Sequence, residues 1–460
     1  MPKKKTALTI EERLQQALVP AEEQPYEVPE NWVWVRLGGV TQVIGGGTPS
    51  TSKKEYYDGG TISWLSPVDL SNYNDIYISR GNKMITLEGL NNSSAKLLPK
   101  DTVCLTSRAP IGYVAIAENE LSTNQGFKSF LPSPTYLARF LYWYLKGNKE
   151  LLESKASGTT FLELSASKAA TIEFPLPPLS EQQRIVERIE ELFTKLDEAK
   201  ERLQEVADSF AVRKAAILHK AFTGELTKQW RRENGVSDES WEEKTLQDVC
   251  SMKITDGTHK TPVYCDSEKG VKFLSAKDIT AEKICWDNIK YIVPELHEEL
   301  YKRLAPQVDD VLLAKNGTTG VAAIVETDDI FDIYVTLAVL RPKKSIIYPL
   351  YLLKVVNSPL CKEQFAQHLT GIGVPNLHLR DIKEVLIPLP TLPEQHEIVR
   401  LIDNLLARER AAQQAAEQAL ASIDLMKKSI LARAFRGELG TNKASEASAL
   451  ELLKQVLAEN

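Results

Sequence analysis

The chain has 460 residues, 43% of them hydrophobic and 26% charged, and its formal net charge at pH 7 is −6. This length predicts roughly two to four folded units. No stretch approaches the roughly 18 consecutive apolar residues of a membrane helix, and the lysine-rich start lacks the apolar core of an export signal. The slightly acidic balance also argues against a protein that coats nucleic acid through phosphate neutralisation alone.

The cysteines and histidines exclude two further classes of protein. Five cysteines are scattered without a C-x-x-C pair, and no histidine pairs with Cys or Asp at ligand spacing. The sequence therefore predicts neither a disulfide framework nor a zinc site. We expect a reducing compartment, the cytoplasm, and no membrane partner.

In chain order, short helical segments are expected at both ends, around two domains and two helical spacers. The predicted boundaries are 1–27 (N-terminal helical segment), 28–175 (first domain), 176–235 (first spacer), 236–387 (second domain), 388–440 (second spacer) and 441–460 (C-terminal helical tail). The terminal helices could lie against each other or on a partner subunit.

The two domains share a faint sequence skeleton. "ISWLSPVDL" (62–70) resembles "VKFLSAKDI" (271–279), and "DTVCLTSRAPIGYVAI" (101–116) resembles "DDVLLAKNGTTGVAAI" (309–324). Short β-branched and apolar runs bounded by Gly, Pro, Asn and Asp predict strands, and an apolar helix is expected late in each domain. The fold class is therefore a mixed α/β (α+β) protein with two similar domains.

The two spacers repeat each other closely. Each begins with a P-L-P-x-L-x-E-Q-x-x-I-V block (175–186 and 388–399) and ends with an I-L-x-x-A-F-x-G-E-L block (217–226 and 430–439). Between the blocks, apolar residues recur at steps of three and four, as in a coiled coil. The first seam is Ile185, Ile189, Leu192, Leu196, Ala199, Leu203, Val206, Phe210 and Ile217, interrupted by Arg213; the second is Ile398, Ile402, Leu405, Ala412, Ala416, Ala419, Ile423, Met426 and Ile430, interrupted by Glu409.

Start and stop signals support two long helices. Ser180 with Gln183 predicts a capping box, Pro393 suits a first turn, and Gly224 and Gly437 predict helix ends. Helices of about 42 residues would be ~60 Å long and must bury their seams. We expect an intrachain antiparallel pair, which would relate the two halves by an approximate twofold axis. Packing of each helix on its own domain, or dimerisation through parallel coils, are the alternatives.

The spacer blocks identify a family that the whole chain resembles, the specificity subunits of type I restriction-modification systems. The entry signature stands as "FPLPPLSEQ" (174–182) and "IPLPTLPEQ" (387–395), and the exit signature as "AFTGELT" (221–227) and "AFRGELG" (434–440). "QWRREN" (229–234) follows the first copy, as is common in the family. The second copy lacks this extension and ends close to the C-terminus.

The resemblance implies a non-catalytic subunit that recognises double-stranded DNA. Each domain would read one half of an asymmetric bipartite target, and the helices would set the spacer length and dock methyltransferase subunits, usually two. Restriction (motor) subunits would complete the complex. This chain would bind no cofactor, because AdoMet, ATP and Mg would belong to the partner subunits.

The chain's own motifs agree with this division of labour. It contains no G-x-x-x-x-G-K-[ST] loop for nucleotide phosphates and no N-P-P-[YF] motif of adenine methyltransferases. "VDDVLLAK" (308–315) offers two acids and a lysine, as a nuclease site would. The aligned segment of the first domain lacks the second acid and the lysine, so a turn leading into a strand is the preferred interpretation.

Two loops in each domain carry the candidate DNA contacts, because loops present polar side chains on a rigid scaffold. In family members the equivalent turns face the groove, and the resemblance carries this role to Thr48, Ser50, Lys53, Lys54, Ser107 and Arg108 in the first domain, and to Thr258, His259, Lys260, Lys315, Asn316, Thr318 and Thr319 in the second. "SASK" (165–168) and "HLRD" (378–381) are weaker candidates that helix capping explains equally well. The alternative function is a coiled-coil adaptor that presents two protein-binding domains.

Overall fold

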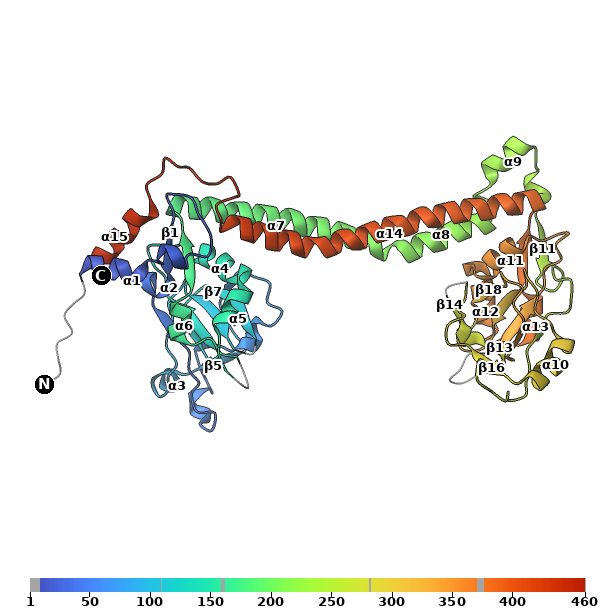
Figure 1. The fold of residues 1–460 in the computed structure, drawn as a ribbon, viewed down its shortest axis with the longest axis horizontal. Helices are drawn as coiled ribbons and strands as arrows, with labels where there is room; N and C mark the ends of the chain where they lie inside the picture. Colours follow the sequence, from blue (N-terminus) through green and yellow to red (C-terminus); the bar gives the residue numbers. More distant parts are fainter. Residues whose placement is uncertain (1–8, 109, 159–161, 281–282, 370–375, 460) are drawn as a thin grey trace. The chain divides into compact units, whose positions relative to one another are not determined.

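The computed structural model describes residues 9–108, 110–158, 162–280, 283–369 and 376–459. The chain divides into two compact units: unit 1 is Met1–Arg202 with Ala419–Asn460, and unit 2 is Leu203–Gln418. Each unit holds one mixed α/β domain together with parts of both helical spacers (Figure 1). The predicted fold class is thus confirmed at the level of two mixed domains and long helices.

The domain of unit 1 contains three sheets. Their strand orders are β2-β9-β6-β7-β4, β5-β3-β8 and β1-β10, and helices α4 and α5 pack against β7 (Figure 1). The strands are β1 Val33–Arg36, β2 Val43–Gly45, β3 Ile62–Leu65, β4 Tyr77–Ile78, β5 Lys83–Ile85, β6 Val103–Ser107, β7 Ile111–Ala117, β8 Ser122–Thr123, β9 Phe127–Phe130 and β10 Glu173–Leu176. The helices are α1 Ile10–Ala17, α2 Leu37–Val40, α3 Leu87–Asn91, α4 Ala138–Gly147, α5 Lys149–Lys155, α6 Ala166–Ala170 and α15 Ala449–Glu459, with 3-10 turns at η1 Ala21–Glu23, η2 Lys54–Tyr56 and η3 Pro67–Leu70.

The domain of unit 2 repeats this plan. Its strand orders are β12-β20-β17-β18, β16-β13-β19 and β11-β21, with a small additional pair, β14-β15. The strands are β11 Glu242–Thr245, β12 Thr255–Asp256, β13 Val271–Leu274, β14 Ile279–Thr280, β15 Lys283–Ile284, β16 Lys290–Ile292, β17 Val311–Ala314, β18 Ala322–Ile324, β19 Phe331–Ile333, β20 Leu337–Leu340 and β21 Leu386–Leu389. The helices are α9 Lys228–Asn234, α10 Pro294–Arg303, α11 Pro349–Val356, α12 Pro359–Gln367 and α13 Leu379–Glu384, with η4 Asp238–Ser240 and η5 Ala276–Asp278.

The backbone confirms the faint alignment between the domains. Asp101 and Asp309, which the sequence aligns, both adopt positive φ, at 65° and 76°, just before β6 and β17. Asp tolerates this left-handed conformation better than most residues. The centres of the three-stranded sheets also match, because β3 pairs in parallel with β8 as β13 does with β19.

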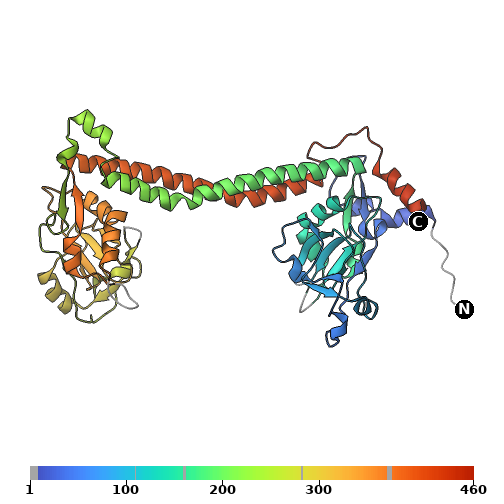
Figure 2. The same cartoon turned by 180° about the vertical axis from the view of Figure 1, so that it is seen from behind.

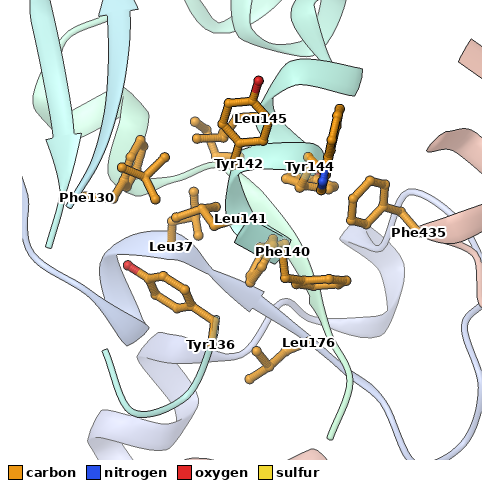
Figure 3. Close-up of a cluster of buried hydrophobic side chains, with 14 of the residues drawn as sticks. Leu37, Phe130, Tyr136, Phe140, Leu141, Tyr142, Tyr144, Leu145, Leu176 and Phe435 are labelled. Atoms are coloured by element: carbon orange, nitrogen blue, oxygen red, sulfur yellow. The ribbon is translucent and has the colours of Figure 1, made fainter. Parts of the chain in front are cut away.

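The exit block of each spacer contributes a phenylalanine to a domain core. In unit 1, Phe435 lies 5.2 Å from Phe140 and 5.0 Å from Tyr144, ring centroid to centroid, within a cluster that includes Leu37, Phe130, Tyr136, Leu141, Tyr142, Leu145 and Leu176 (Figure 3). In unit 2, Phe222 lies 5.6 Å from Tyr351. The repeated Ala-Phe pair of the exit block therefore anchors each spacer end, because large buried aromatic rings dominate core energetics.

The entry block supplies a second anchor, a buried glutamate that accepts the indole N–H of the domain's first tryptophan. Trp32 Nε1 donates to Glu181 at 2.8 Å in unit 1, and Trp241 Nε1 donates to Glu394 at 3.0 Å in unit 2. Both glutamates are fully buried. The E of the repeated E-Q pair is thus explained by a hydrogen bond between the spacer and the domain.

The Q of the same pair binds the backbone where the late helix of the domain begins. Gln182 accepts from the Leu137 N–H at 2.8 Å and donates to the Thr135 and Pro177 carbonyls at 3.0 Å. Gln395 accepts from the Tyr348 N–H and donates to the Ile346 and Pro390 carbonyls in the same way. Both amides therefore satisfy backbone groups that would otherwise be buried without partners.

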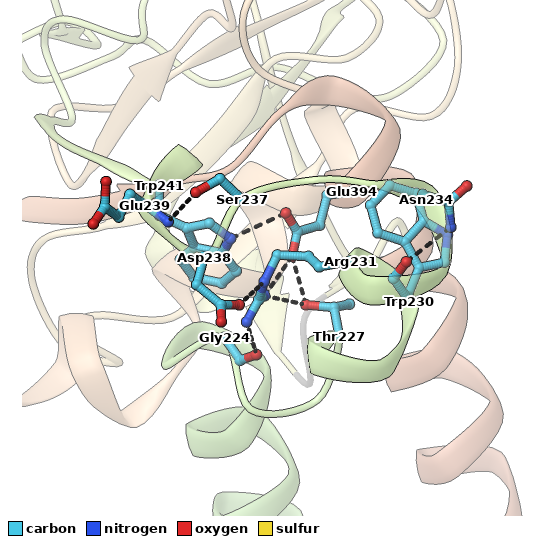
Figure 4. A network of polar contacts seen from close by, with 10 residues as sticks. All are labelled: Gly224, Thr227, Trp230, Arg231, Asn234, Ser237, Asp238, Glu239, Trp241 and Glu394. Carbon is cyan, nitrogen blue, oxygen red and sulfur yellow. Dashed lines mark hydrogen bonds and ion pairs between the residues drawn. The ribbon is translucent and has the colours of Figure 1, made fainter.

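The two buried glutamates differ in charge compensation. In unit 2, Arg231 donates to Glu394 at 2.7 Å, to Asp238 at 2.8 Å and to the Gly224 carbonyl at 2.9 Å, and Thr227 also donates to Glu394 (Figure 4). In unit 1 the place of this arginine is taken by neutral donors, with Asn442 donating to Glu181 at 2.8 Å. The "QWRREN" extension thus supplies the counter-charge that the second copy lacks.

The second spacer is one helix, α14 Leu392–Ala434, and the first is α7 Leu179–Asp208 followed by α8 Phe210–Phe222. At the junction, the Ser209 hydroxyl and Arg213 both donate to the Val206 carbonyl, at 3.0 and 3.2 Å. Such side-chain competition for a helical carbonyl bends or interrupts helices. The single long helix expected for the first spacer is therefore corrected to two.

Within each unit the spacer segments run antiparallel. In unit 2, Arg213 pairs with Glu409 at 2.5 Å, while Thr227, later in the chain, bonds the earlier residue Glu394. In unit 1, Asp197 pairs with Lys427 at 2.6 Å, and Arg184 bonds the Thr441 carbonyl at 3.0 Å. The two residues that interrupt the predicted seams, Arg213 and Glu409, are thus each other's partners.

Several details of the predicted spacers are corrected. The helix α7 begins at Leu179, before Ser180, and the Gln183 side chain bonds Glu187, so the predicted capping box does not form. Met426, 49% exposed, and Val206, 39% exposed, lie outside the buried seam, as does the exposed Ala412. Pro393 lies in the first turn of α14, and Gly224 and Gly437 adopt φ of 80° and 73° after the helix ends, as predicted.

The first turns of both spacers also pack on their own domains, so one of the alternatives holds in part. Ile185, Val186 and Ile189 belong to the core of the first domain. Ile398, Val399 and Ile402 belong to the core of the second. Each spacer therefore starts as a component of a domain and continues as a paired helix.

The terminal helices α1 and α15 pack together in unit 1 (Figure 2). Arg13 donates to the Leu457 carbonyl at 3.3 Å, and the Ala449 N–H donates to the Asn31 carbonyl at 3.0 Å. This answers the question that the sequence left open, although the first eight residues of the predicted N-terminal segment lie outside the described residues. Among the helices that the structure describes, none is long and apolar enough to cross a membrane.

We expect Glu394→Gln to destabilise unit 2, whereas its counterpart Glu181→Gln should not destabilise unit 1. The first change removes the charge that balances buried Arg231, which costs about 3 kcal/mol, the low end for a broken buried pair because Asp238 remains. The second keeps an acceptor for the Trp32 indole. Calorimetric unfolding of the full chain checks both, and equal losses for the two variants would contradict the proposed difference.

Glu181 also gives the stability of unit 1 a pH dependence. Burial raises the pKa of the Glu181 carboxyl above its ordinary value. The folded state then binds this proton more tightly than the unfolded chain, so the stability that the carboxyl contributes is present at low pH and is lost as pH rises through the folded pKa. Glu181→Gln should therefore stabilise unit 1 relative to the wild type more at about pH 8 than at about pH 4, as measured by thermal unfolding.

Candidate nucleic-acid interface

The first predicted loop, residues 45–54, lies against the loop after β8. A Cβ on Gly46 would stand 1.9 Å from the Asn124 carbonyl oxygen, so this close approach requires glycine. Thr48 hydrogen-bonds the Gln125 side chain, and the Trp64 indole donates to the Gly47 carbonyl at 2.9 Å. The first part of the loop is thus held by the close approach of Gly46, the Gly47 carbonyl and the Thr48 side chain, which leaves its far end free to present side chains.

That far end is polar and exposed. The Ser50 hydroxyl contacts that of Ser52 at 2.9 Å, and Lys53 Nζ donates to the Tyr56 hydroxyl at 2.9 Å. This hydrogen bond raises the pKa of Lys53. Lys54 is also exposed, at the start of η2. Ser50, Lys53 and Lys54 can therefore reach a ligand outside the domain.

The corresponding loop of the second domain, residues 254–261, is built in the same way. A Cβ on Gly257 would stand 2.0 Å from the Ile333 carbonyl oxygen, which matches the position of Gly46 against the loop after β8. His259, with a side chain 73% exposed, contacts Asp256 at 3.2 Å, and Lys260 pairs with Glu299 at 2.8 Å. Thr258 differs, because it is buried and accepts the Lys260 N–H at 3.1 Å.

The second predicted turn places its first residue inside each domain. Ser107 is fully buried, donates to the Gly126 carbonyl at 3.1 Å and accepts from Lys128 Nζ at 3.2 Å. The aligned Lys315 is buried as well and pairs with Asp256 at 2.5 Å. Ser107, Lys315 and Thr258 thus hold the loops together, and the expectation that their side chains face outward is corrected.

The buried ammonium group occupies the base of the loops in both domains but comes from different strands. Lys128 lies on β9 opposite Gly45 of β2, whereas in the second domain the lysine is at the end of β17 and Asp256 takes the place of Gly45. Glu163, 3.3 Å away, balances Lys128. Sequence alignment missed this exchange because the two lysines are not at aligned positions.

The remaining residues of the second turn are more accessible. Arg108 is half-buried and lies 4.0 Å from Glu163. Thr318 is exposed and donates to the Ala276 carbonyl at 3.1 Å, Asn316 is half-buried beside it, and Thr319 is bonded to the Gly317 carbonyl at 3.4 Å. The turn therefore brings Asn316 and Thr318 to the surface next to the three-stranded sheet.

The acids of "VDDVLLAK" are engaged in separate ion pairs. Asp310 binds Arg341 at 2.8 Å, Asp309 binds Lys344 at 2.6 Å, and Lys315 belongs to Asp256. Within the described residues no group of three or more potential ligands could hold a metal ion. The segment is a turn that leads into β17, as the sequence analysis predicted.

The two weaker candidates lie at helix starts. Ser165 caps α6 by accepting the Lys168 N–H at 3.2 Å, which agrees with the capping interpretation of "SASK". His378 stands at the same place before α13, and Arg380 of "HLRD" contacts Asp381 at 3.0 Å.

The structure also brings forward residues that the sequence did not single out. A pocket of about 330 Å³ in the second domain is lined by Tyr264, Phe273, Ser275, Ala276, Lys277, Lys290, Asn316, Gly317, Tyr334 and Thr336. A pocket of about 410 Å³ in the first domain is lined by Thr51, Tyr57, Lys83 and Met84. These residues come from strands and loops that are separated in the chain, so no local sequence signal groups them.

Comparison with known proteins supports this architecture. The family model described as "Type I restriction modification DNA specificity domain" matches the chain twice, over residues 29–208 and 238–419. The MjaIX specificity subunit of Methanocaldococcus jannaschii is 31% identical over 402 residues, covering 81% of this chain and 87% of that protein. The EcoBI specificity subunit of Escherichia coli is 29% identical over 342 residues, covering 70% and 72%.

Solved structures share the fold. The HsdS subunit from Thermoanaerobacter tengcongensis superposes with a TM-score of 0.63 at 21% identity, covering 91% of this chain and all of that one. Two copies of one family domain cover most of the chain, and each coincides with a mixed domain and the start of its spacer. The chain therefore belongs to the family of type I restriction-modification specificity subunits, the non-catalytic DNA-recognition components of these systems.

Proposed function

We propose that each domain reads one half of an asymmetric bipartite sequence in double-stranded DNA. The observation that carries this proposal is a contrast between the two domains. Their sheets, glycine contacts and anchors correspond, yet the exposed side chains on corresponding loops differ, with Ser50 and Lys53 in one domain and His259 and Lys260 in the other. A shared scaffold with different surface donors and acceptors suits two readers of different base sequences.

The proposed contacts are the loop residues that are accessible. They are Thr48, Ser50, Lys53, Lys54 and Arg108 in the first domain, and His259, Lys260, Asn316 and Thr318 in the second. Ser107, Thr258 and Lys315 are left out because their side chains are buried and hydrogen-bonded within the domain.

We further propose that the spacers form one intrachain coiled coil that sets the distance between the half-sites. Two features support this. The helix α14 is continuous and contributes residues to both units, and the contacts between spacer segments are antiparallel in each unit taken separately. An antiparallel pair of similar halves has an approximate twofold axis, as local duplex DNA has, and paired readers use such symmetry.

The partners follow from the subunit class. Methyltransferase subunits, two of them, would dock along the spacers, and restriction subunits would join the complex. AdoMet, ATP and Mg would be bound by those partners. The competing proposal of a protein-binding adaptor predicts no DNA shift in a gel assay of the chain with its methyltransferase partner, at a stated salt concentration.

Exchange of residues 28–174 for the same region of another specificity subunit should change one half of the methylated sequence. These boundaries include β1 and the first two residues of β10, Glu173 and Phe174, while Pro175 and Leu176 of β10 belong to the entry block that both spacers share. The readout is sequencing of methylated adenines in cells that carry the complex. Exchange of 236–387 is the matched control and should change the other half. A change in both halves from either exchange would refute the modular proposal.

Deletion of seven residues within 199–208, together with seven within 413–422, should reduce the number of base pairs between two half-sites whose sequences stay unchanged. The contacts Asp197–Lys427 and Arg213–Glu409 bracket these segments. Seven helical residues span about 10 Å, or up to about three base pairs. A deletion in one helix alone is the control, since it breaks the heptad register and should abolish methylation. If the double deletion left the number of base pairs between the half-sites unchanged, this would contradict the proposal that the coiled coil sets that distance.

Asn316→Ala should relax recognition at one position of the second half-site. Loss of a base-edge contact costs about 1–3 kcal/mol against the correct base only. The measurement is methylation of a library randomised across both half-sites. Lys315→Ala is the neighbouring control: it breaks a buried pair, so unit 2 should lose thermal stability without a change at any single base.

A further inference from the structure

Each domain carries a lysine at the same register of its three-stranded sheet, beside a tyrosine that the sequence does not align. Lys83 on β5 is the strand partner of Trp64 on β3, and Lys290 on β16 is the strand partner of Phe273 on β13. Trp64 and Phe273 occupy aligned positions in "ISWL" and "VKFL". The two lysines are therefore structural equivalents.

A tyrosine ring stands against the aromatic residue in both sheets. The ring centroids of Tyr57 and Trp64 are 6.2 Å apart at 79°, and those of Tyr264 and Phe273 are 6.2 Å apart at 66°. Tyr57 precedes Trp64 by seven positions and Tyr264 precedes Phe273 by nine, so linear alignment does not superimpose the tyrosines. The arrangement recurs in space although the loops that build it differ.

Both lysines are exposed and line the pockets described above. Lys83 shares its pocket with Tyr57, and Lys290 Nζ lies 4.0 Å above the Tyr264 ring. Some other exposed lysines of the second domain are neutralised, as Lys260 is by Glu299. Lys83 and Lys290 have no carboxylate partner among the residues that the structure describes. The Tyr264 ring restricts the Lys290 ammonium group and leaves its charge free for an external anion.

We propose that Lys83 and Lys290, each in a pocket that a tyrosine also lines, bind DNA phosphates and set the register of the two domains on the duplex. This inference rests on the proposed function. Contacts common to two readers of different sequences carry no base information, so they suit the sequence-independent phosphate backbone. The neighbours that differ, Thr51 in one pocket and Asn316 in the other, suit base edges.

The geometry assigns the tyrosines a positioning role. Tyr57 already donates its hydroxyl to the Pro49 carbonyl at 2.7 Å, so it ties the 45–54 loop to the lysine site. Tyr264 is 44% exposed and bears the Lys290 ammonium on its face. A compact, strongly hydrated ammonium acts as a point charge toward phosphate, without the bidentate geometry that base reading uses.

The test measures DNA affinity of the complex with methyltransferase subunits as a function of salt, for Lys83→Ala, Lys290→Ala and the double variant. Each lost phosphate contact should lower the slope of log K against log salt by about 0.9, which is about eightfold in affinity at 0.1 M salt. The loss should be equal on specific DNA and on DNA with either half-site scrambled, and the methylated sequence should not change. Lys83→Arg and Lys290→Arg should retain the slope.

Matched controls are Lys100→Ala and Lys302→Ala, which remove the same charge from the exposed surface of each domain. An unchanged slope in the Lys83 and Lys290 variants, a loss confined to one base pair, or failure of these variants to assemble with methyltransferase subunits would each overturn the phosphate assignment. If the wild-type complex itself does not bind DNA, the proposed function fails, which is a distinct result.

Discussion

The structure depends on a buried carboxylate that accepts the indole N–H of a tryptophan, once in each unit. Glu181 with Trp32, and Glu394 with Trp241, fix the first turn of a long helix to the domain that precedes it. The adjacent glutamines complete the attachment through three backbone groups each. A buried polar group is costly without partners, so these bonds specify one orientation of helix and domain rather than a general apolar contact.

The other end of each spacer is fixed by packing. Phe222 and Phe435 enter the cores that contain Tyr351 and Tyr144, so each domain receives the beginning of one spacer and the end of the other. This exchange accounts for the antiparallel contacts inside each unit. It also explains why identity between the spacers is concentrated in their entry and exit blocks, while the middle, which needs only an apolar seam, diverges.

The domains show how one scaffold presents different surfaces. At the base of loops 45–54 and 254–261 each domain buries a lysine ammonium, Lys128 from β9 in one domain and Lys315, directly after β17, in the other. Because a buried charge must be paired, each lysine has a carboxylate partner of its own, Glu163 for Lys128 and Asp256 for Lys315. The three-stranded sheet, by contrast, keeps a lysine at the same register in both domains, Lys83 opposite Trp64 and Lys290 opposite Phe273.

The sequence by itself determined the two-domain plan, the single long helix of the second spacer and the glycines that follow both spacers, because periodicity, proline and left-handed glycine act locally. It also marked Arg213 and Glu409 as misfits, and these two residues pair. Only the tertiary structure decided that Ser107, Thr258 and Lys315 point inward and that Met426 is exposed rather than buried in the seam. It also showed that Lys83 corresponds to Lys290. Those outcomes depend on strand pairing and on the partner available to each buried polar group, and both are set by residues far away in the chain.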